Sequence, residues 1–368
     1  MCAYTKPFPP IRTLSDNVYD GLIDAIGNTP LIKLHRASQL TSCNIYGKAE
    51  FLNPGGSVKA RAALYLIKHA EQAGLLTPGK GGTIVEATAG NTGISLAQIA
   101  RARGYNCIIV IPETQSQQKK DALLYAGAQL VQVRARPYSH PNNYVKLGKR
   151  LADQLHAVYT NQFDNTANRC AHELTTGPEI WAQLRGEVHG FSCAVGTGGT
   201  LAGTANYLRS VSDNSVKIAL TDPCGAKLVR YYRDGKLEAH GSSITEGIGQ
   251  GRVTANLEGF TPDYAFEIDD DEALQVVYSL MQEEGLCLGL SSGVNVAGAM
   301  RLARELGAGH NIVTVLCDEG TRYADKMFNV EFLRGKQLPT PEWIDRGVSA
   351  QVSEAVKQVT VADDEAEG

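Results

Sequence analysis

The sequence predicts an α/β fold of two doubly wound domains, each built on a mostly parallel sheet, with a ligand in the cleft between them. Short apolar runs rich in β-branched residues alternate with amphipathic stretches, and the pattern pauses near residues 140–160 before it resumes. Strands that are apolar throughout are typical of parallel sheets covered by helices on both faces. Such folds bind ligands at the carboxyl ends of their strands.

The alternation of strands and helices forms two arrays, one before and one after the pause. The first array begins with the strand GTIVEAT at 82–88. The stretch GNTGISLAQIARARG at 90–104 predicts a helix that ends at a stop signal, Arg103 followed by Gly104. A strand, a helix and a strand then complete the array, namely NCIIVIP at 106–112, SQQKKDALLYAGA at 116–128 and QLVQVRA at 129–135.

The second array resumes after a helical region at about 142–156. GFSCAVGTGGTLAGTANYLR at 190–209 predicts a strand, a glycine loop and a helix. The alternation then continues as before, which predicts a second sheet. Its elements are the strand VKIALTDP at 216–223, the helices EALQVVYSLMQEEG at 272–285 and GVNVAGAMRLARELG at 293–307, and the strand NIVTVLCD at 311–318.

The two arrays predict four segments along the chain. Residues 46–155 form a smaller α/β domain with the loop TAGNTG, and residues 156–335 form a larger α/β domain with the glycine loop. We expect residues 1–45 to belong to the larger domain and residues 336–368 to form a C-terminal extension. Its last stretch, VADDEAEG, is acidic and is expected to be disordered.

Composition and charge argue against several classes of protein. The formal net charge is −4 and no block of basic residues occurs, which argues against nucleic-acid binding. No apolar run reaches the roughly 18 residues of a membrane helix, and the N-terminus lacks a signal pattern. The 8 cysteines form no CxxC pair and the 8 histidines form no HExxH motif. We therefore expect a reduced, cytoplasmic protein without a disulfide framework or a metal site.

Three loops rich in glycine or asparagine each follow a predicted strand and open a predicted helix. They are NPGGSVK at 53–59, TAGNTG at 88–93 and VGTGGTLAG at 195–203. Helix N-termini present unpaired backbone N–H groups and the positive end of the helix dipole, so each loop is a candidate anion site. Three such loops that converge on one cleft would indicate a ligand with several anionic groups.

The loop GTGGTLAG is open to three interpretations. It resembles a dinucleotide fingerprint, and Asp222 closes the next predicted strand, where the ribose-binding acid would stand. However, Leu201 occupies the position of the third glycine of that fingerprint. The loop can instead wrap a single phosphate with its N–H groups and two hydroxyls, or it can serve tight packing.

The other motifs also have plainer interpretations when each is taken alone. Lys59 can be a solvated lysine in a first helical turn, and Asn91, Thr92, Ser291 and Ser292 can be helix caps. NQFDNTAN can be a polar surface loop, and TEGIGQGR a flexible glycine turn.

Taken together, seven motifs occur in the order of one known family. They are GNTPLIKL, NPGGSVKAR, TAGNTG, NQFDNTAN, GTGGTLAG, EGIGQG and SSGVN. Between about residues 22 and 325 the chain resembles the cysteine synthases (O-acetylserine sulfhydrylases), which are pyridoxal-phosphate enzymes with the tryptophan-synthase-β fold. Phosphate-loop and nicotinamide interpretations leave the lysine and serine loops unexplained.

The resemblance implies a role for each site residue. Lys59 would hold pyridoxal 5′-phosphate as an imine and act as the catalytic amine. Asn91 would contact the ring hydroxyl oxygen, and Ser291 the pyridine nitrogen. The implied phosphate-binding residues are Gly196, Thr197, Gly198, Gly199 and Thr200, and the implied substrate-binding residues are Thr88, Ala89, Thr92, Gln162 and Gly247.

The activity that the resemblance implies is a β-replacement. O-acetyl-L-serine and sulfide would give L-cysteine through an aminoacrylate intermediate, with the amine of Lys59 removing the α-proton. The family further implies a homodimer, and serine acetyltransferase is a partner that family members often bind.

Three departures from the family pattern leave the donor and the second substrate open. Ala89 stands where many relatives carry serine, Ala60 stands where an aspartate is common, and Arg252 adds positive charge near the expected pocket mouth. Related alternatives are cystathionine β-synthase, cyanoalanine synthase, phosphoserine sulfhydrylase and cysteine desulfhydrase activities. A dehydratase-like lyase is disfavoured by the loops NQFDNTAN and EGIGQG, and a catalytically silent binding protein is disfavoured by the intact Lys59 and phosphate loop.

Overall fold

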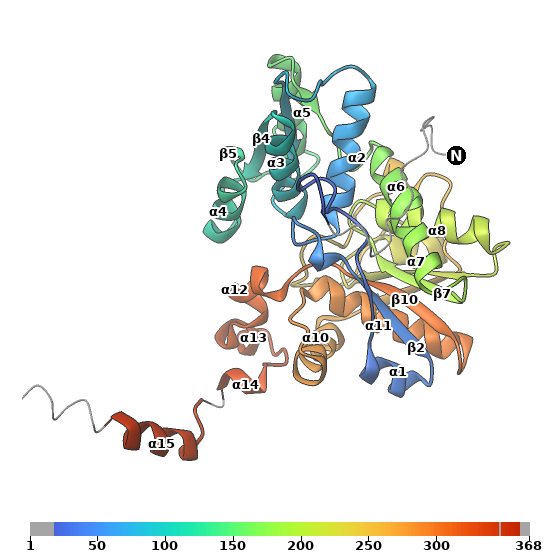
Figure 1. Ribbon diagram of the computed structural model, residues 1–368, viewed down its shortest axis with the longest axis vertical. Coiled ribbons are helices and arrows are strands. Elements are labelled where there is room, and N and C mark those ends of the chain that lie inside the picture. The colour runs from blue at the N-terminus through green and yellow to red at the C-terminus, as the bar shows by residue number, and fades with distance from the viewer. Residues whose placement is uncertain (1–17, 346, 361–368) are drawn as a thin grey trace, which may run out of the picture. The chain divides into compact units, whose positions relative to one another are not determined.

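The computed structural model describes residues 18–345 and 347–360 of the chain (Figure 1). The chain divides into two compact units, Met1–Thr321 and Arg322–Gly368. Both sheets belong to the first unit. Within the described ranges, none of the helices is both long and apolar enough to span a membrane. The acidic stretch at 361–368, for which we expect disorder, lies outside the described residues.

The larger sheet has six strands in the order β1 (Leu31–Lys33), β2 (Asn44–Ala49), β10 (Asn311–Leu316), β7 (Gly190–Ala194), β8 (Lys217–Pro223) and β9 (Tyr264–Ile268). β1 pairs with β2 antiparallel at one edge, and all other neighbours are parallel. Every residue of β7 and β10 is buried. Burial on both faces explains why these strands are apolar throughout.

The smaller sheet has four parallel strands in the order β5 (Gln129–Val133), β4 (Asn106–Pro112), β3 (Thr83–Ala87) and β6 (Val158–Tyr159). Successive residues of a strand point to opposite faces. Ile109 and Ile111 accordingly join one apolar cluster, whereas Val110 joins another. The sheet is therefore covered on both faces.

Two helices of the first unit, α3 (Asn91–Arg103) and α10 (Asp270–Glu284), end at the glycines that close their predicted stretches, Gly104 with φ of 77° and Gly285 with φ of 69°. α10 begins before its predicted stretch, where Asp269 caps it by accepting a hydrogen bond from the backbone N–H of Glu272. The helices are α1 (His35–Thr41), α2 (Lys59–Gln72), α3 (Asn91–Arg103), α4 (Gln117–Tyr125), α5 (Tyr144–Gln154), α6 (Ala167–Ala171), α7 (Gly177–Gln183), α8 (Gly199–Val211), α9 (Leu228–Asp234), α10 (Asp270–Glu284) and α11 (Leu290–Leu306). Short turns are η1 (Glu50–Leu52), η3 (Ala255–Leu257) and η4 (Gly320–Tyr323), which are 3-10, and η2 (His172–Thr176), which is π-helical.

Helices flank both sheets (Figure 1). α2 and α3 share an apolar cluster with β3 and β4, and α5 packs against the same two strands through a second cluster. α11 packs across β7, β8 and β10 of the larger sheet. The approach of α11 to β8 is close, because a Cβ atom at Gly298 would lie 2.2 Å from Oγ1 of Thr221. A glycine is required at that crossing.

The second unit consists of short helices. They are α12 (Ala324–Met327), α13 (Val330–Gly335), α14 (Glu342–Asp345) and α15 (Ala350–Thr360). Asn329 caps α13 by accepting a hydrogen bond from the backbone N–H of Phe332 at 3.0 Å. Leu333 is the buried apolar residue of α13.

The predicted α/β class with mostly parallel sheets is confirmed. β2 begins at Asn44 and belongs to the larger sheet, whereas β6 at Val158–Tyr159 belongs to the smaller sheet. The chain thus leaves the larger sheet after β2 and returns to it after β6. Both crossings lie close to the limits of the predicted 46–155 segment. The four domain limits themselves stay a prediction.

The cysteines differ from expectation at one position. Six cysteines of the described residues are free, but Cys170 is disulfide-bonded. The expected fully reduced state is therefore wrong at Cys170. A single bridge leaves no spacing pattern in a sequence, so the absence of a CxxC pair could not exclude it.

Candidate active site

Lys59 opens α2 beside the carboxyl end of β10. The backbone N–H of Val58 donates to the carbonyl of Cys317 at 2.9 Å, and Ser57 forms a backbone bridge with Asp318. The Lys59 side chain is half-buried. Burial lowers the pKa of His172, and the charges of Arg61 and Lys59 lower it further. The strand-to-helix turn thus places the predicted catalytic amine at the end of a central strand.

A cluster of buried charges holds the helix that carries Lys59. Arg61 donates to both carboxylate oxygens of Glu50 and of Glu179 at 2.6–2.8 Å, and Lys48 forms an ion pair with Glu179 at 2.7 Å. All four side chains are at most 4% exposed. We call Lys48, Glu50, Arg61 and Glu179 the ion-pair cluster. It connects α2 to β2, η1 and α7 and so fixes the start of α2.

The glycine loop between β7 and α8 is lined by bare backbone. Gly198, the N-cap of α8, has φ of 87° and no side chain caps the helix there. A Cβ atom at Gly196 would lie 2.3 Å from the carbonyl oxygen of Gly247, and one at Gly199 would lie 2.2 Å from Oδ1 of Asn168. The N-terminus of an uncapped helix offers backbone N–H donors and a positive dipole end. The loop is therefore built to bind an anion such as a phosphate.

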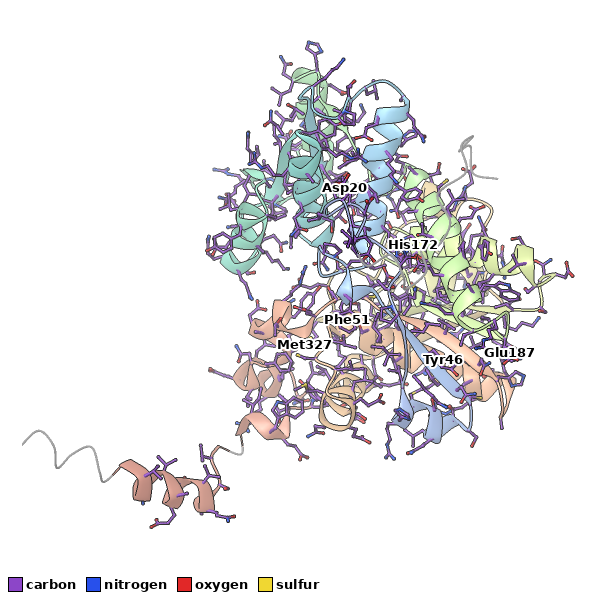
Figure 2. The ribbon with its side chains drawn as sticks, viewed as in Figure 1. Asp20, Tyr46, Phe51, His172, Glu187 and Met327 are labelled. Atoms are coloured by element: carbon purple, nitrogen blue, oxygen red, sulfur yellow. The ribbon has the colours of Figure 1, made fainter. Side chains whose placement is uncertain are left out.

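Two hydroxyls of the same loop are held in place by neighbouring side chains. Nδ2 of Asn168 donates to Oγ1 of Thr197 at 2.9 Å, which leaves the Thr197 proton for another acceptor. Oγ1 of Thr200 lies 3.1 Å from Nε2 of His172, a buried residue of the π-helical turn η2 that Figure 2 labels. Sequence reasoning found both threonines but gave no role to Asn168, the last residue of NQFDNTAN, and missed His172, which belongs to no motif.

Ser291 lies in the first turn of α11, beside the end of β10. It is 6% exposed. The neighbouring Ser292 accepts a hydrogen bond from the backbone N–H of Cys317 at 2.9 Å. Asn295 joins the strands beneath, accepting from the N–H of Ala194 and donating to the carbonyl of Val315, both at 2.7 Å. The serine loop is thus tied to the strand end that also anchors the lysine loop.

The loop TAGNTG connects β3 to α3 and reaches both sheets. Nδ2 of Asn91 donates to Oδ2 of Asp318 at 2.6 Å, which joins this loop to the end of β10. Oγ1 of Thr92 donates to Oε1 of Gln162 at 2.6 Å. No side chain caps α3 at Gly90. An uncapped helix end beside a hydroxyl and an amide suits a carboxylate ligand.

Gln162 is held by its backbone as well as its side chain. Its carbonyl accepts hydrogen bonds from Nδ2 of Asn168 at 2.9 Å and from Nδ2 of Asn256 at 3.1 Å. Asn168 also contacts the phosphate loop through Thr197. Gln162 and Asn168, which both belong to the NQFDNTAN motif, therefore connect the candidate carboxylate site to the candidate phosphate site.

The structure brings the remaining predicted residues to the same loops. Thr88 is buried and accepts a hydrogen bond from the N–H of Gly90 at 3.2 Å. Ala89 is half-buried against the apolar cluster of the smaller sheet. Gly247 has φ of 78°, and its carbonyl lies against Gly196. These positions border the site, and their contacts with a substrate stay a prediction.

Arg252 differs from expectation. Its guanidinium forms a bidentate ion pair with the carboxylate of Asp164, with distances of 2.9 and 2.8 Å. It also lies over the ring of Phe163. The expected positive charge near the pocket mouth is therefore neutralised by Asp164, a residue of the NQFDNTAN loop that the sequence did not connect with Arg252.

Glu86, at the end of β3, is a buried carboxyl that sequence reasoning missed. Burial raises the pKa of Glu86 to about 7, against hydrogen bonds from Thr160, Gln162 and Ala87 that lower it. Its signal in the sequence was a lone acid in the apolar run GTIVEAT. No group of three or more histidines, cysteines or acids suited to a metal ion occurs in the described part of the chain.

Comparisons with known proteins are consistent with this site. Residues 22–318 match the family model described as pyridoxal-phosphate dependent enzyme. The chain is 53% identical over 329 residues to cysteine synthase 1 of Neurospora crassa, covering 88% of this chain and 87% of that protein. It is 52% identical over 324 residues to cysteine synthase 1 of Emericella nidulans, with 87% of each chain covered.

Solved structures show the same fold. O-ureido-L-serine synthase superposes with a TM-score of 0.78 at 31% identity, covering 92% of this chain and 99% of that one. The O-acetylserine dependent cystathionine beta-synthase from Helicobacter pylori superposes with a TM-score of 0.75 at 33% identity, covering 84% of this chain and 98% of that one.

Proposed function

The chain belongs to the family of pyridoxal-phosphate dependent enzymes, and from that premise we propose that it is a cysteine synthase. It replaces the acetoxy group of O-acetyl-L-serine by sulfide and so forms L-cysteine. One observation carries this proposal. The lysine, asparagine and serine loops are tied to the end of β10 by hydrogen bonds, and the glycine loop is linked to the asparagine loop through Asn168 and Gln162.

The residues present fit pyridoxal phosphate. The glycine loop leaves the N-terminus of α8 without a side-chain cap, and its backbone is held close to Gly247 and Asn168 at positions where a Cβ atom would not fit, which suits a phosphate bound by N–H groups. Lys59 would supply the amine that binds the cofactor, Asn91 would contact its ring hydroxyl oxygen, and Ser291 would contact its ring nitrogen. When bound, the cofactor supplies an electron sink that stabilises negative charge at the α-carbon of an amino acid.

The chain's own residues bind the substrate and move its proton. Thr88 through its O–H and Gln162 through its N–H, with the backbone N–H groups of Thr92 and the N-terminus of α3, hold the α-carboxylate, because the hydroxyl proton of Thr92 is donated to Oε1 of Gln162. The ε-amine of Lys59 accepts the proton from the α-carbon, as a general base positioned by the ion-pair cluster. Ser291 is a neutral hydroxyl, so it does not impose a positive charge on the ring nitrogen, and this favours elimination of acetate over transamination.

The experiment is a substrate comparison on the purified protein loaded with pyridoxal phosphate. O-acetylserine is added first, followed by sulfide, homocysteine or cyanide in separate reactions. We expect cysteine formation with sulfide to be the fastest reaction. Lys59→Ala should lower kcat by about 10²- to 10⁴-fold, the range for loss of a general base. Far faster turnover with serine plus homocysteine than with O-acetylserine plus sulfide would contradict the proposal.

Two further measurements test the assigned residues. Borohydride reduction followed by peptide mapping should place the cofactor label on Lys59, and a label on another lysine would refute that assignment. Gly196→Ala should weaken cofactor binding by at least about tenfold, because backbone atoms occupy the space of its Cβ. Gly251→Ala is the matched control, since its Cβ would meet nothing within 4 Å.

The remaining expectations are proposals that rest on the family resemblance. They are a homodimer, a cytoplasmic location and binding of serine acetyltransferase. A relative in Saccharomyces cerevisiae, 36% identical to this chain over 330 residues, is called a putative mitochondrial cysteine synthase. Size-exclusion chromatography with light scattering tests the first, cell fractionation the second, and co-purification with serine acetyltransferase the third.

A further inference from the structure

Glu86 lies behind the candidate carboxylate site and is surrounded by neutral donors. It is 0% exposed. Its carboxyl group accepts hydrogen bonds from Oγ1 of Thr160, from the backbone N–H of Gln162 at 3.2 Å and from that of Ala87 at 3.1 Å. The groups that lower its pKa are the neutral donors Thr160, Gln162 and Ala87. The carboxyl group therefore depends on these donors when it is ionised.

The side chain of Gln162 lies between Glu86 and Thr92. Its Nε2 approaches Oε1 of Glu86 at 3.5 Å, and its Oε1 accepts the hydroxyl proton of Thr92 at 2.6 Å. A primary amide donates through nitrogen and accepts through oxygen, whereas a carboxylate only accepts. The ionised Glu86 must therefore face the nitrogen of Gln162. The opposite orientation would place two acceptors against each other.

We propose that Glu86 is a positioning residue for substrate binding. It fixes the amide of Gln162 in the orientation in which the second Nε2 proton faces the α-carboxylate of the amino-acid substrate. The inference rests on the proposed function, which places the substrate carboxylate against Thr92 and Gln162. A carboxylate ligand requires donors, so a reversed amide would present an acceptor and would weaken binding.

The proposal makes substrate binding depend on the ionisation of Glu86. The titratable groups that face Glu86 are Cys107 from β4, Tyr144 from α5 and Tyr159 from β6, and burial raises the pKa of each. None of them titrates between pH 5 and 8, so Glu86, with a pKa of about 7, is the group of this pocket that does. A protonated Glu86 can donate to Oε1 of Gln162, which permits the reversed orientation. Binding should therefore weaken as the pH falls through about 7.

The test compares the holoenzyme with the Glu86→Gln variant between pH 6 and 8.5. The amide that this substitution introduces can donate to Oε1 of Gln162, so the preference for one orientation is lost. We expect the KM for O-acetylserine to rise about tenfold at pH 8, the value of roughly one hydrogen bond, with kcat changed less than about threefold. At pH 6 the two KM values should converge. The matched control is Glu71→Gln, which alters a glutamate bonded to Tyr105 outside the site and should follow the wild type.

Two results would overturn the proposal. One is a KM ratio between variant and wild type that is the same at every pH, and the other is a fall in kcat with unchanged KM. Omitting the second substrate and titrating O-acetylserine against cofactor absorbance measures binding without turnover. This readout separates the role of Glu86 from the proposed cysteine synthase activity. The wild type can bind O-acetylserine with the expected pH profile even if sulfide is not its nucleophile.

A second variant keeps the proposal testable if Glu86→Gln does not fold. Thr160→Val removes a donor to the ionised carboxyl group and leaves Gln162 and Thr92 in place. The midpoint of the pH profile for O-acetylserine binding should then shift upward. An unchanged midpoint would contradict the role of Glu86.

Discussion

Two buried carboxyl groups beside the site, Glu179 and Glu86, behave in opposite ways. Burial acts to raise the pKa of Glu179, but Arg61 and Lys48 outweigh it and hold that pKa at about 2. Burial also acts on Glu86, whose donors are neutral, and its pKa rises to about 7. Similar burial thus leads to a permanent charge in one place and a titratable group in the other, and the neighbouring cations make the difference.

The two groups also serve different parts of the site. Glu179 belongs to the ion-pair cluster that holds α2, the helix that carries Lys59. The negative charge of Glu179 therefore helps to hold Lys59 in place. Glu86 lies behind Gln162, a proposed carboxylate donor whose side-chain oxygen accepts the hydroxyl proton of Thr92. We infer that the ion-pair cluster that supports Lys59 keeps its charges near neutral pH. The part of the site around Gln162 instead responds to pH, because Glu86 titrates there.

The largest expected effect comes from breaking the ion-pair cluster. Arg61→Met leaves the carboxylates of Glu50 and Glu179 buried with a single cation, Lys48, to share. Removal of one partner from a buried ion pair typically costs about 3–5 kcal/mol. The free energy of unfolding in urea at pH 7 measures this loss.

The control for that measurement is an exposed ion pair. Lys149 pairs with Asp153, and both side chains are 63% exposed. Lys149→Met should change the free energy of unfolding by no more than about 0.5 kcal/mol. If Arg61→Met proved as mild as Lys149→Met, the cluster would not be the support of α2.

The second prediction concerns how stability depends on pH. The pKa of Glu86 is about 7 in the folded protein, against an ordinary value of 4.5, so the folded protein retains the proton longer than the unfolded chain. Stability should therefore fall as the pH rises from about 4.5 to 7 and then level off. The pKa of Glu179 is lowered instead, so its contribution is present above about 4.5, is lost as the pH falls toward 2, and stays constant between pH 5 and 8.

Glu86→Gln should remove this dependence. The stability of the variant relative to wild type should increase by about 2–3 kcal/mol between pH 5 and pH 8, since one pKa unit corresponds to about 1.4 kcal/mol. Unfolding in urea at several pH values provides the comparison, with Glu71→Gln as the control. Parallel curves for wild type and Glu86→Gln would show that another group accounts for the slope.

The smallest effect is expected for a single donor to Glu86. Thr160→Val replaces a hydroxyl by a methyl group of similar size and should cost about 1.5–3 kcal/mol at pH 8, the range for a hydrogen bond to a charged group. The cost should be smaller at pH 5, where the carboxyl group is protonated. Thermal unfolding at the two pH values measures it, and an equal cost at both would mean that the bond does not depend on the charge.

The sequence was sufficient for the loop-to-helix turns of the candidate site, which are contiguous in the chain. NPGGSVK, TAGNTG, GTGGTLAG and SSGVN each combine a tight loop with a helix start, and the structure places all four at such turns. A local motif of this kind is visible because its function requires particular residues within a few positions. The glycines of the phosphate loop are an example, since a side chain at Gly196 or Gly199 would meet other atoms closer than about 2.5 Å.

Other residues became visible only through contacts between distant segments. Asp318 binds Asn91, 227 positions away, and Arg252 pairs with Asp164 across 88 positions. The surroundings of these residues in the chain do not indicate which partner each one has. The expectation for Arg252 was wrong for this reason, because a charge read from a sequence is not known to be free or neutralised.

By itself, the sequence determined the α/β class, the mostly parallel strands and the order of the motifs. These follow from local patterns of apolar residues, glycines and helix caps, which depend on neighbours along the chain. The tertiary structure alone decided which buried charges are paired. Burial, donors and cations from separate segments set the pKa of Glu179 and of Glu86, and only the folded chain brings those groups together.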